Sequence, residues 1–505
     1  MVRAWGKNGA VSEDVRAIAK GTGLLLPATL VGSGLLLVLD QYVNGVLGNA
    51  DYGLFGALKR VLQVAGFVVL LGMENAVIRF VATATTRDDA RAAVKRAMLT
   101  TFVASSVAAG LLAALAEPLA AWLDPSPDTA LVLRIGALSL PFASLRTVAV
   151  SASQGWKVVT HRAVVMYLAW PIAQFAGVAV LGHLLGLGAV GVTAAYTAAM
   201  ALGAALSVGF LLRLSPGALR PAAAAGPTLV AMLGFAWPMW TQGILMGLYT
   251  WLDQFLLAGL RSTTEAGIYG PVATLTPLFG MGLGALNGMF APIIAERRTA
   301  GDLPGLERLY RTVTRWAVAL AVPPLVVCAV LPEVVLGLWP NGSAEAAPAL
   351  RIACLAQLVC TGVGSVNYLL IMAGHQRATL WNAVPAVLLN LALSFALLPT
   401  LGVTGAAIAN GVAMVTANVI GLWQVHAALG IHPFDRAFLR PLVAAAPCAA
   451  VVWAFGGLAA PPLVVVLAAG VVGGLVFLAA LRALGLDADD RVVVDAIVAK
   501  VRRRK

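Results

Sequence analysis

The chain has 505 residues, of which 60% are hydrophobic and 11% are charged, and its mean hydropathy is +0.90. Soluble domains carry about 25% charged residues, so this composition excludes a soluble globular protein and indicates an integral membrane protein. The excess of 34 Lys and Arg over 22 Asp and Glu residues would suggest nucleic-acid binding in a soluble protein, but in a membrane protein it reflects topology. We therefore expect no nucleic-acid partner.

Sequence motifs for catalysis or for cofactor binding are not found. The four cysteines, Cys328, Cys354, Cys360 and Cys448, lie in apolar segments without a CxxC spacing, so neither a disulfide framework nor a metal site is predicted. The chain also contains no HExxH, no pair of catalytic carboxylates and no phosphate-binding GxxxxGK[ST] loop. We expect a protein that is not an enzyme and that has no catalytic residues, no metal and no cofactor.

Apolar segments follow one another along almost the whole chain after a hydrophilic start. A segment of roughly 20 residues is needed to cross the apolar core of a membrane, and about fourteen such segments can be placed. The predicted fold class is therefore an all-α integral membrane protein with about 14 transmembrane helices. The segments lie approximately at 22–41, 53–80, 96–118, 130–153, 163–185, 188–212, 228–259, 266–295, 313–337, 348–373, 379–399, 402–428, 439–457 and 461–485.

A duplication organises these segments. Asp40-Gln41, followed by Tyr52-Gly53, comes back 213 residues later as Asp253-Gln254, followed by Tyr269-Gly270. Downstream pairs keep nearly the same offset; they are His161 and His375, Pro171 and Pro385, Gly188 and Gly402, Gly191 and Gly405, and Trp122 and Trp339. Each copy contains six predicted helices, an even number, so the two repeats are expected to have the same orientation in the membrane.

The predicted domain organisation follows from this duplication. Residues 1–20 form an N-terminal segment and residues 216–227 a linker, both cytoplasmic. The repeats form a first six-helix bundle at 21–215 and a second at 228–429, and helices 13 and 14 at 430–486 stand outside the duplication. A basic tail at 487–505 ends the chain.

The charges of the loops predict the orientation of the chain. One alternating set of loops carries most Lys and Arg residues, whereas the other carries mainly acidic residues. By the positive-inside rule the basic set is cytoplasmic, so both termini are expected inside. The basic residues are also expected to attract anionic membrane lipids.

Several segments of both repeats together form a recognisable pattern. They are Leu47-Gly48-x-x-x-Tyr52-Gly53-Leu54-Phe55, Gly72, Arg79-Phe80-Val81, Gly267-Ile268-Tyr269, Asn287, Ala291-Pro292, Asn390 and Leu401-Gly402-Val403-x-Gly405-Ala406-Ala407-Ile408-Ala409. Over about residues 15 to 430 the chain thereby resembles the polysaccharide (oligosaccharide, O-antigen type) flippase family of the multidrug/oligosaccharidyl-lipid/polysaccharide (MOP, MATE-like) exporter superfamily. A departure is Lys59-Arg60, which lies where the family pattern is mostly apolar.

The resemblance implies two six-helix bundles around a central cavity. It further implies that a lipid-linked oligosaccharide, carried on undecaprenyl pyrophosphate, moves across the inner membrane of a bacterial or archaeal cell by alternating access. A polysaccharide polymerase and glycosyltransferases are the implied protein partners. Two alternatives stay open, which are a MATE-type cation-coupled multidrug exporter and a scaffold that does not transport.

Cations inside the membrane are the candidate binding residues. Such groups cost about 2.5–3.5 kcal/mol each on insertion scales and usually face a cavity or a partner. Lys59, Arg60 and Arg146 lie within predicted helices, and cationic groups match a phosphate-bearing headgroup. The alternative is a structural ion pair with Asp40.

Six more charged residues, three acidic and three basic, are candidates for binding, coupling or gating. Arg134 and Arg351 occupy equivalent positions near the outer surface, where they contact a headgroup or extend to the interface. Asp40 and Asp253 are equivalent too, and they are expected either to bind a coupling cation or to pair with Lys59, Arg60 or Arg134. Glu74 and Arg79 near the inner end of the second helix are candidates for a gate or a surface salt bridge.

Overall fold

The computed structural model describes residues 7–485 apart from 125, 127, 157, 159, 218–225 and 343, and this part of the chain is helical throughout. The predicted all-α fold class is confirmed. The first half contains α1 (Lys7–Leu70), α2 (Met73–Ala82), α3 (Arg87–Ala114), α4 (Ala116–Leu123), α5 (Thr129–Ala137), α6 (Ser139–Gly155), α7 (Thr160–Val164), the π-helix η1 (Val165–Ala169), α8 (Trp170–Gly177), the π-helix η2 (Val178–Leu184) and α9 (Gly188–Leu214). The second half contains α10 (Leu229–Leu260), α11 (Thr263–Phe279), α12 (Met281–Thr299), α13 (Leu303–Val330), α14 (Pro332–Leu336), the 3-10 helix η3 (Ala344–Ala346), α15 (Ala347–Val363), α16 (Val366–Met372), α17 (Gln376–Leu429), the 3-10 helix η4 (Arg436–Phe438), α18 (Leu439–Phe455) and α19 (Pro462–Ala483).

Eleven segments of the described chain are long and apolar enough to cross a membrane. Two of these segments are bent at a glycine with positive φ, which is 72° at Gly48 in α1 and 51° at Gly402 in α17. Glycine adopts this conformation because it has no Cβ. Both bends coincide with predicted boundaries between consecutive helices, so each of these long helices combines two predicted ones. The number of fourteen transmembrane helices stays a prediction.

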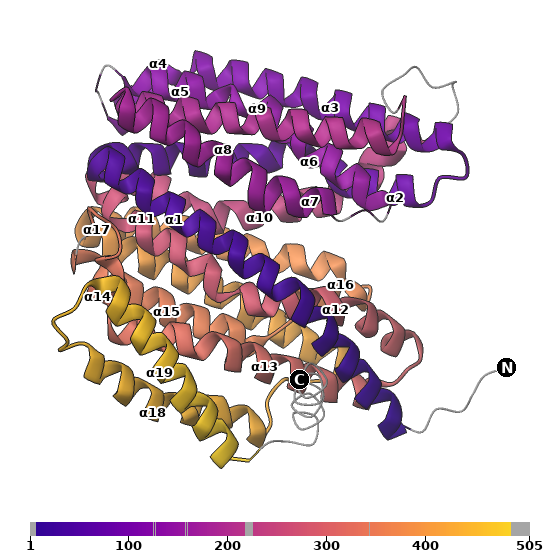
Figure 1. The fold of residues 1–505 in the computed structure, drawn as a ribbon. Helices are drawn as coiled ribbons and strands as arrows, with labels where there is room; N and C mark the ends of the chain where they lie inside the picture. The colour runs from indigo at the N-terminus through magenta and orange to yellow at the C-terminus, as the bar shows by residue number, and fades with distance from the viewer. Residues whose placement is uncertain are drawn as a thin grey trace, which may run out of the picture.

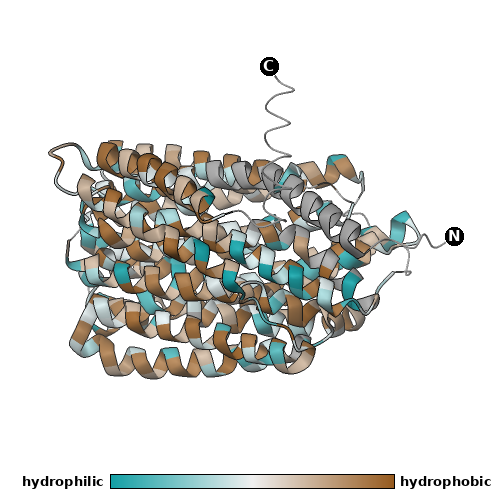
Figure 2. Cartoon of the chain, turned by 90° about the horizontal axis from the view of Figure 1, so that it is seen from below, coloured by the Kyte–Doolittle hydropathy of each residue, from teal (hydrophilic) through white to brown (hydrophobic). Residues whose placement is uncertain are grey.

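The outer helices expose apolar side chains along their whole length. On α3 these are Leu99, Val103, Val107 and Leu111, and on α19 they are Val464, Leu467, Val471, Leu475 and Leu478. Figure 2 shows hydrophobic positions dominating the outer helices. Continuous apolar faces of this size are disfavoured in water and are matched by the hydrocarbon core of a bilayer. The chain is therefore a multi-pass membrane protein.

The helices form two groups with separate apolar cores (Figure 1). The first bundle comprises α2 to α9, and its core lies partly around Leu133 and partly around Val148. The second bundle comprises α11 to α19, and its core lies around Leu350 and Tyr310. The exact boundaries of the repeats stay a prediction.

Two long helices, α1 and α10, belong to both bundles. In α1, Leu39 is part of the first-bundle core, whereas Leu37 packs against the second-bundle core. Figure 1 shows the N-terminal part of α1 running across the second bundle, and α1 contacts α12. In α10, Ala236 is buried in the first bundle and Leu257 in the second. The bundles are therefore connected by shared helices as well as by a linker.

The bundles are in backbone contact at the end of the molecule that holds Gly48, which we call the Gly48 end. Gly53 of α1 lies against the Thr263 carbonyl of α11, and Gly267 of α11 lies against the Asn49 carbonyl of α1. A Cβ at either glycine would overlap the facing carbonyl oxygen. This end is therefore closed, while in Figure 1 the ribbons of the two bundles diverge towards the opposite end, where α2 and α16 lie.

A helix break separates α1 from α2. Leu71 has φ 51° and Gly72 has φ 69°, so the helical hydrogen bonding is interrupted here. Trp240 of α10 donates its indole N–H to the carbonyls of Phe67 and Val68, at 3.1 and 3.0 Å. Carbonyls freed at membrane depth require such a partner. The break is thus held open by a helix that both bundles share.

Candidate functional site

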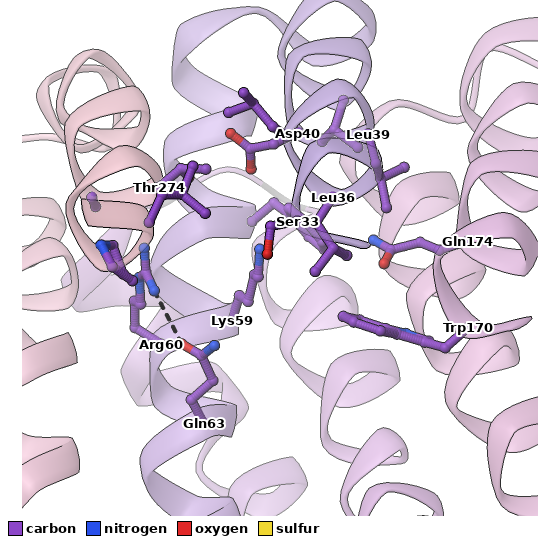
Figure 3. Close-up of a pocket in the computed structure, with 16 residues that line it drawn as sticks. Ser33, Leu36, Leu39, Asp40, Lys59, Arg60, Gln63, Trp170, Gln174 and Thr274 are labelled. Atoms are coloured by element: carbon purple, nitrogen blue, oxygen red, sulfur yellow. Dashed lines mark hydrogen bonds between the residues drawn. The ribbon is translucent and has the colours of Figure 1, made fainter. Parts of the chain in front are cut away.

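A cavity of about 330 Å³ lies between the two bundles, at the lower end of the roughly 300–1,000 Å³ typical of ligand pockets. Its walls come from both halves of α1, from the start of α8 and from α11 (Figure 3). Most of the lining is apolar. The polar lining residues are Ser33, Asp40, Lys59, Arg60, Gln63, Gln174 and Thr274.

Lys59 is a cation without a protein partner in the described part of the chain. The amine makes no hydrogen bond or ion pair there, and Figure 3 shows it pointing into the cavity towards Ser33. The predicted ion pair with Asp40 is not formed, since no contact within 4.0 Å joins the two groups. A desolvated cation without a counter-charge is costly. The cavity therefore offers a binding position for an anionic group.

Arg60 is held more tightly than Lys59. Its Nε donates to Gln254 Oε1 of α10 at 3.1 Å, and its Nη1 donates to Gln63 Oε1 at 3.2 Å. Gln254 in turn donates to the Ala266 carbonyl at 3.0 Å. Arg60 as a whole residue is 8% exposed. Arg60 thus connects α1 to α10 and contributes its charge to the cavity wall.

The two equivalent aspartates make the same hydrogen bond in both repeats. Tyr52 Oη donates to Asp40 Oδ2 at 2.6 Å, and Tyr269 Oη donates to Asp253 Oδ2 at 2.6 Å. Only Asp40 lines the cavity; Asp253 is 3% exposed and lies away from it. The predicted partners Lys59, Arg60 and Arg134 form no ion pair with either carboxylate among the described residues. Each carboxylate is instead paired with a tyrosine hydroxyl that donates a hydrogen bond to it.

Asp40 has a second donor, which comes from the second bundle. Trp339 Nε1 donates to Asp40 Oδ2 at 3.1 Å. Two residues later, Asn341 donates its backbone N–H to Asn44 Oδ1 at 2.9 Å and its Nδ2 to the Asn44 carbonyl at 2.6 Å. The segment that contains Trp339 therefore covers the side of the cavity that faces the Gly48 end.

Arg146 lies behind the cavity wall and is not one of the residues that line it. Its guanidinium carbon is 5.2 Å from the ring centroid of Trp170, which does line the cavity. Its Nε and Nη1 are buried and have no hydrogen-bond partner among the described residues. The predicted headgroup candidate thus contacts the cavity through an aromatic ring.

Arg134 and Arg351 lie far from the cavity, in equivalent exposed ion pairs. Arg134 Nη2 is 2.8 Å from Glu117 Oε1, and Arg351 Nη2 is 3.1 Å from Glu333 Oε1. Half of each arginine side chain is exposed, so water and headgroups screen the pairs. Neither residue is placed to touch a molecule in the cavity.

Neutralising these exposed arginines is expected to have a small effect. Exposed ion pairs contribute about 0–1 kcal/mol, so Arg134→Gln and Arg351→Gln should each lower the free energy of unfolding by less than about 1 kcal/mol. Transport should be retained. Thermal unfolding of the purified protein and a transport measurement check this, and loss of transport by either variant would contradict the assignment.

Glu74 and Arg79 do not form the predicted salt bridge. Glu74 Oε1 accepts from Asn75 Nδ2 at 2.8 Å, and its other carboxylate oxygen is buried and has no partner in the part of the chain that the structure describes. Arg79 lies over the ring of Phe235 of α10, 4.2 Å from the centroid. Among the described residues neither joins an ion pair, so both contribute to packing next to the break between α1 and α2.

The arrangement as a whole can bind an anion and orient it. One wall offers the amine of Lys59 and the guanidinium of Arg60, and the facing wall offers Trp170 and Gln174. Sequence analysis did not select Trp170, Gln174 or the donors to Asp40. In the described residues no cluster of three or more His, Cys, Asp or Glu side chains is arranged for a metal ion.

Comparison with known protein families gives one family model, described as polysaccharide biosynthesis protein, which matches residues 45–339. The probable flippase AglR of Haloferax volcanii is 24% identical over 219 residues, which is 42% of this chain. The match spans 46% of the length of that relative.

Solved structures with the same fold cover most of the chain. The lipid II flippase MurJ in an inward closed conformation has a TM-score of 0.71 at 12% identity, over 90% of this chain and 97% of that one. An inward-facing multidrug resistance MATE family transporter of the MOP superfamily has a TM-score of 0.65 at 12% identity, over 79% and 94%. A MOP superfamily transporter from Pyrococcus furiosus has a TM-score of 0.60 at 14% identity, over 83% and 96%.

Proposed function

The chain belongs to the polysaccharide biosynthesis protein family, and from this premise we propose that it is a flippase that moves a lipid-linked oligosaccharide across the membrane. The structural neighbours are transporters and flippases, not enzymes, and AglR carries the name of a probable flippase. A cavity between two bundles suits such a protein, because a polar headgroup needs an enclosed route through the apolar core.

The observation that carries the proposal is the unpartnered amine of Lys59 in that cavity. A headgroup attached to its lipid through a phosphate or pyrophosphate is anionic, and Lys59 beside Arg60 supplies a matching positive charge. We infer that the substrate is a polyprenyl-pyrophosphate-linked oligosaccharide. Lys59 and Arg60 contact its phosphates.

We further propose that the protein lies in the inner membrane with both termini in the cytoplasm. The Gly48 end then faces away from the cytoplasm, and it is the closed end in this structure. A cavity shut on that side accepts a lipid-linked precursor made on the cytoplasmic side. Glycosyltransferases that make this precursor and a polymerase that consumes it are the proposed partners.

A cation-coupled drug exporter is the second candidate, since MATE transporters share the fold. It is favoured by one observation, which is that Asp40 lines the cavity. However, an exporter of cationic drugs would have to bind them beside Lys59 and Arg60, and like charges repel. The balance of charge in the cavity favours an anionic substrate.

Deletion of the gene in its native host tests the proposal. We expect surface polysaccharide or protein-linked glycan to fall and the lipid-linked precursor to accumulate, both measured by mass spectrometry. Reintroduction of the wild-type chain should restore both. The Arg134→Gln variant, whose ion pair is exposed and remote from the cavity, should restore them equally well.

The same strains distinguish the second candidate. If the glycans and precursor are unchanged while sensitivity to cationic dyes rises, the protein is a drug exporter and the flippase proposal is wrong. If neither changes, the chain has no transport role in glycan assembly.

A further inference from the structure

The wall of the cavity that faces Lys59 and Arg60 has its own chemistry. Trp170 and Gln174 are one turn apart on α8, so their side chains lie on the same face of the helix. Both line the cavity, and Figure 3 shows them on the side opposite Arg60 and Gln63. The two walls therefore come from different helices and carry different groups.

Gln174 presents its amide to the cavity. The residue is 4% exposed and lines the cavity, and its amide makes no hydrogen bond within the described part of the chain. Its amide oxygen and nitrogen are accessible from the cavity, and an amide in a protein interior normally has hydrogen-bond partners. A glutamine amide offers one acceptor and two donors in a plane, which matches a pair of neighbouring hydroxyl groups.

The ring of Trp170 is fixed in orientation by contacts behind it. The guanidinium carbon of Arg146 lies 5.2 Å from the centroid of the Trp170 ring. The ring of Tyr196 packs against it edge to face, with 6.5 Å between the two ring centroids. A rigid aromatic surface beside a free amide suits a ligand that has both an apolar face and hydroxyl groups at its edge. A pyranose ring has this combination, because its C–H groups form one face and its hydroxyls point outwards.

We propose that Trp170 and Gln174 form a saccharide subsite that binds the sugar next to the phosphate. The pyranose ring of the sugar stacks on the indole of Trp170, and the sugar hydroxyls form hydrogen bonds with Gln174. The phosphate lies on the opposite wall at Lys59 and Arg60. Arg146 is a positioning residue that holds the indole. This inference rests on the proposed function and adds a direction to it, with the sugar towards α8 and the phosphate towards α1.

The volume limits what the subsite holds in this conformation. A cavity of about 330 Å³ is too small for a complete oligosaccharide in addition to a pyrophosphate. It accommodates the first sugar with its phosphate. The subsite therefore selects for the linkage sugar and tolerates variation in the sugars beyond it.

Binding of defined lipids to the purified full-length chain tests the subsite. The probes are a short polyprenyl pyrophosphate, called the bare phosphate, and the same lipid carrying one glucose or one N-acetylglucosamine. Microscale thermophoresis in detergent measures each Kd. We expect the wild type to bind at least one glycosylated probe about tenfold more tightly than the bare phosphate, as one well-formed set of contacts provides.

The variants should separate the two walls. Trp170→Ala and Gln174→Leu should remove that tenfold preference while leaving the Kd of the bare phosphate within about twofold, and Trp170→Phe should retain most of it. Lys59→Gln should weaken all three probes alike. Trp453→Ala, which removes a 74% exposed ring on α18, is the matched control and should behave as wild type.

Each result has a definite meaning. If the wild type binds bare and glycosylated lipids equally, or if Trp170→Ala weakens all probes equally in a protein that unfolds at the wild-type temperature, the saccharide subsite is wrong while the flippase proposal stands. If the wild type binds none of the three lipids, the proposed function itself fails. An altered preference in Arg146→Met with an unchanged Kd for the bare phosphate supports its positioning role.

Discussion

Alanine at Gly53 or Gly267 is expected to open the Gly48 end. Each added methyl would overlap a backbone carbonyl of the facing helix, Thr263 or Asn49, and backbone moves less readily than a side chain. Overpacking costs about 1–3 kcal/mol, and each 1.4 kcal/mol changes a population ratio tenfold, so the closed state should lose about tenfold or more relative to open ones.

Cysteine accessibility measures this shift. The four native cysteines are buried, so Thr274→Cys in the cavity wall provides a single reactive site. A membrane-impermeant maleimide applied to intact cells should label it about tenfold faster in the Gly53→Ala background. Equal labelling rates in the two backgrounds would contradict the proposed closure at this end.

Gly110 provides the matched control for this experiment. It lies on α3, where an added Cβ would have no atom of the described residues within 4 Å. In a helix interior alanine is favoured over glycine by about 1 kcal/mol, so Gly110→Ala should preserve or raise stability. It should leave the labelling of Thr274→Cys unchanged. The same substitution should thus speed the labelling at Gly53 but not at Gly110. Such a difference would identify the close approach of the two bundles at Gly53 as the cause.

Lys59→Met is expected to stabilise the protein and to abolish transport. Lys59 has no ion pair among the described residues, so its charge costs insertion energy, about 2.5–3.5 kcal/mol on membrane scales, without a compensating contact. Methionine removes this cost and fills a similar volume. We expect unfolding at a higher temperature, together with at least a tenfold fall in translocation of a lipid-linked probe in proteoliposomes.

Arg60→Met should behave differently from Lys59→Met. It leaves Gln254 Oε1 and Gln63 Oε1 without their donor, and a buried acceptor without its partner costs about 1–3 kcal/mol. Arg60→Met should therefore lower both stability and transport. If Lys59→Met also lowers stability, Lys59 has a structural partner and the free-cation assignment is wrong. Full transport by a folded Lys59→Met protein would remove Lys59 from the substrate site.

The duplicated sequence predicted the fold but did not distinguish structural from cavity residues. Where both copies agree, the structure uses the residues for framework contacts. Asp40 and Asp253 both bond to a tyrosine, and Arg134 and Arg351 both pair with a glutamate. The presence of the same residue at equivalent positions of the two repeats therefore indicated a structural contact. Sequence analysis, in contrast, treated these four residues as candidates for binding or coupling.

The four residues proposed to bind the substrate lie where the two copies differ. With the offset of 217 that relates Tyr52 to Tyr269, Lys59 and Arg60 correspond to Thr276 and Pro277. With the offset of 214 that relates Pro171 to Pro385, Trp170 and Gln174 correspond to Val384 and Leu388. The asymmetry between the copies was a usable signal for all four positions, and only Lys59 and Arg60 were selected, because their charge was conspicuous.

Other features depended on three-dimensional information. The hydrogen bonds of Trp339 to Asp40 and of Trp240 to the carbonyls at Phe67 and Val68 join residues more than 170 positions apart. No periodicity or local pattern connects such residues. The break at Leu71 was hidden as well, because leucine rarely adopts positive φ and signals a continuous helix.

The sharing of α1 and α10 between the bundles bears on how the duplication arose. The first helix of each copy, α1 or α10, covers apolar surface of the other bundle. In a protein made of one copy alone, this surface would be uncovered. Such an ancestor would have been stable as a pair of identical chains, each lending its first helix to its neighbour. Duplication within one chain makes this exchange of first helices intramolecular, and it allows the two copies to differ at positions such as Lys59 and Trp170.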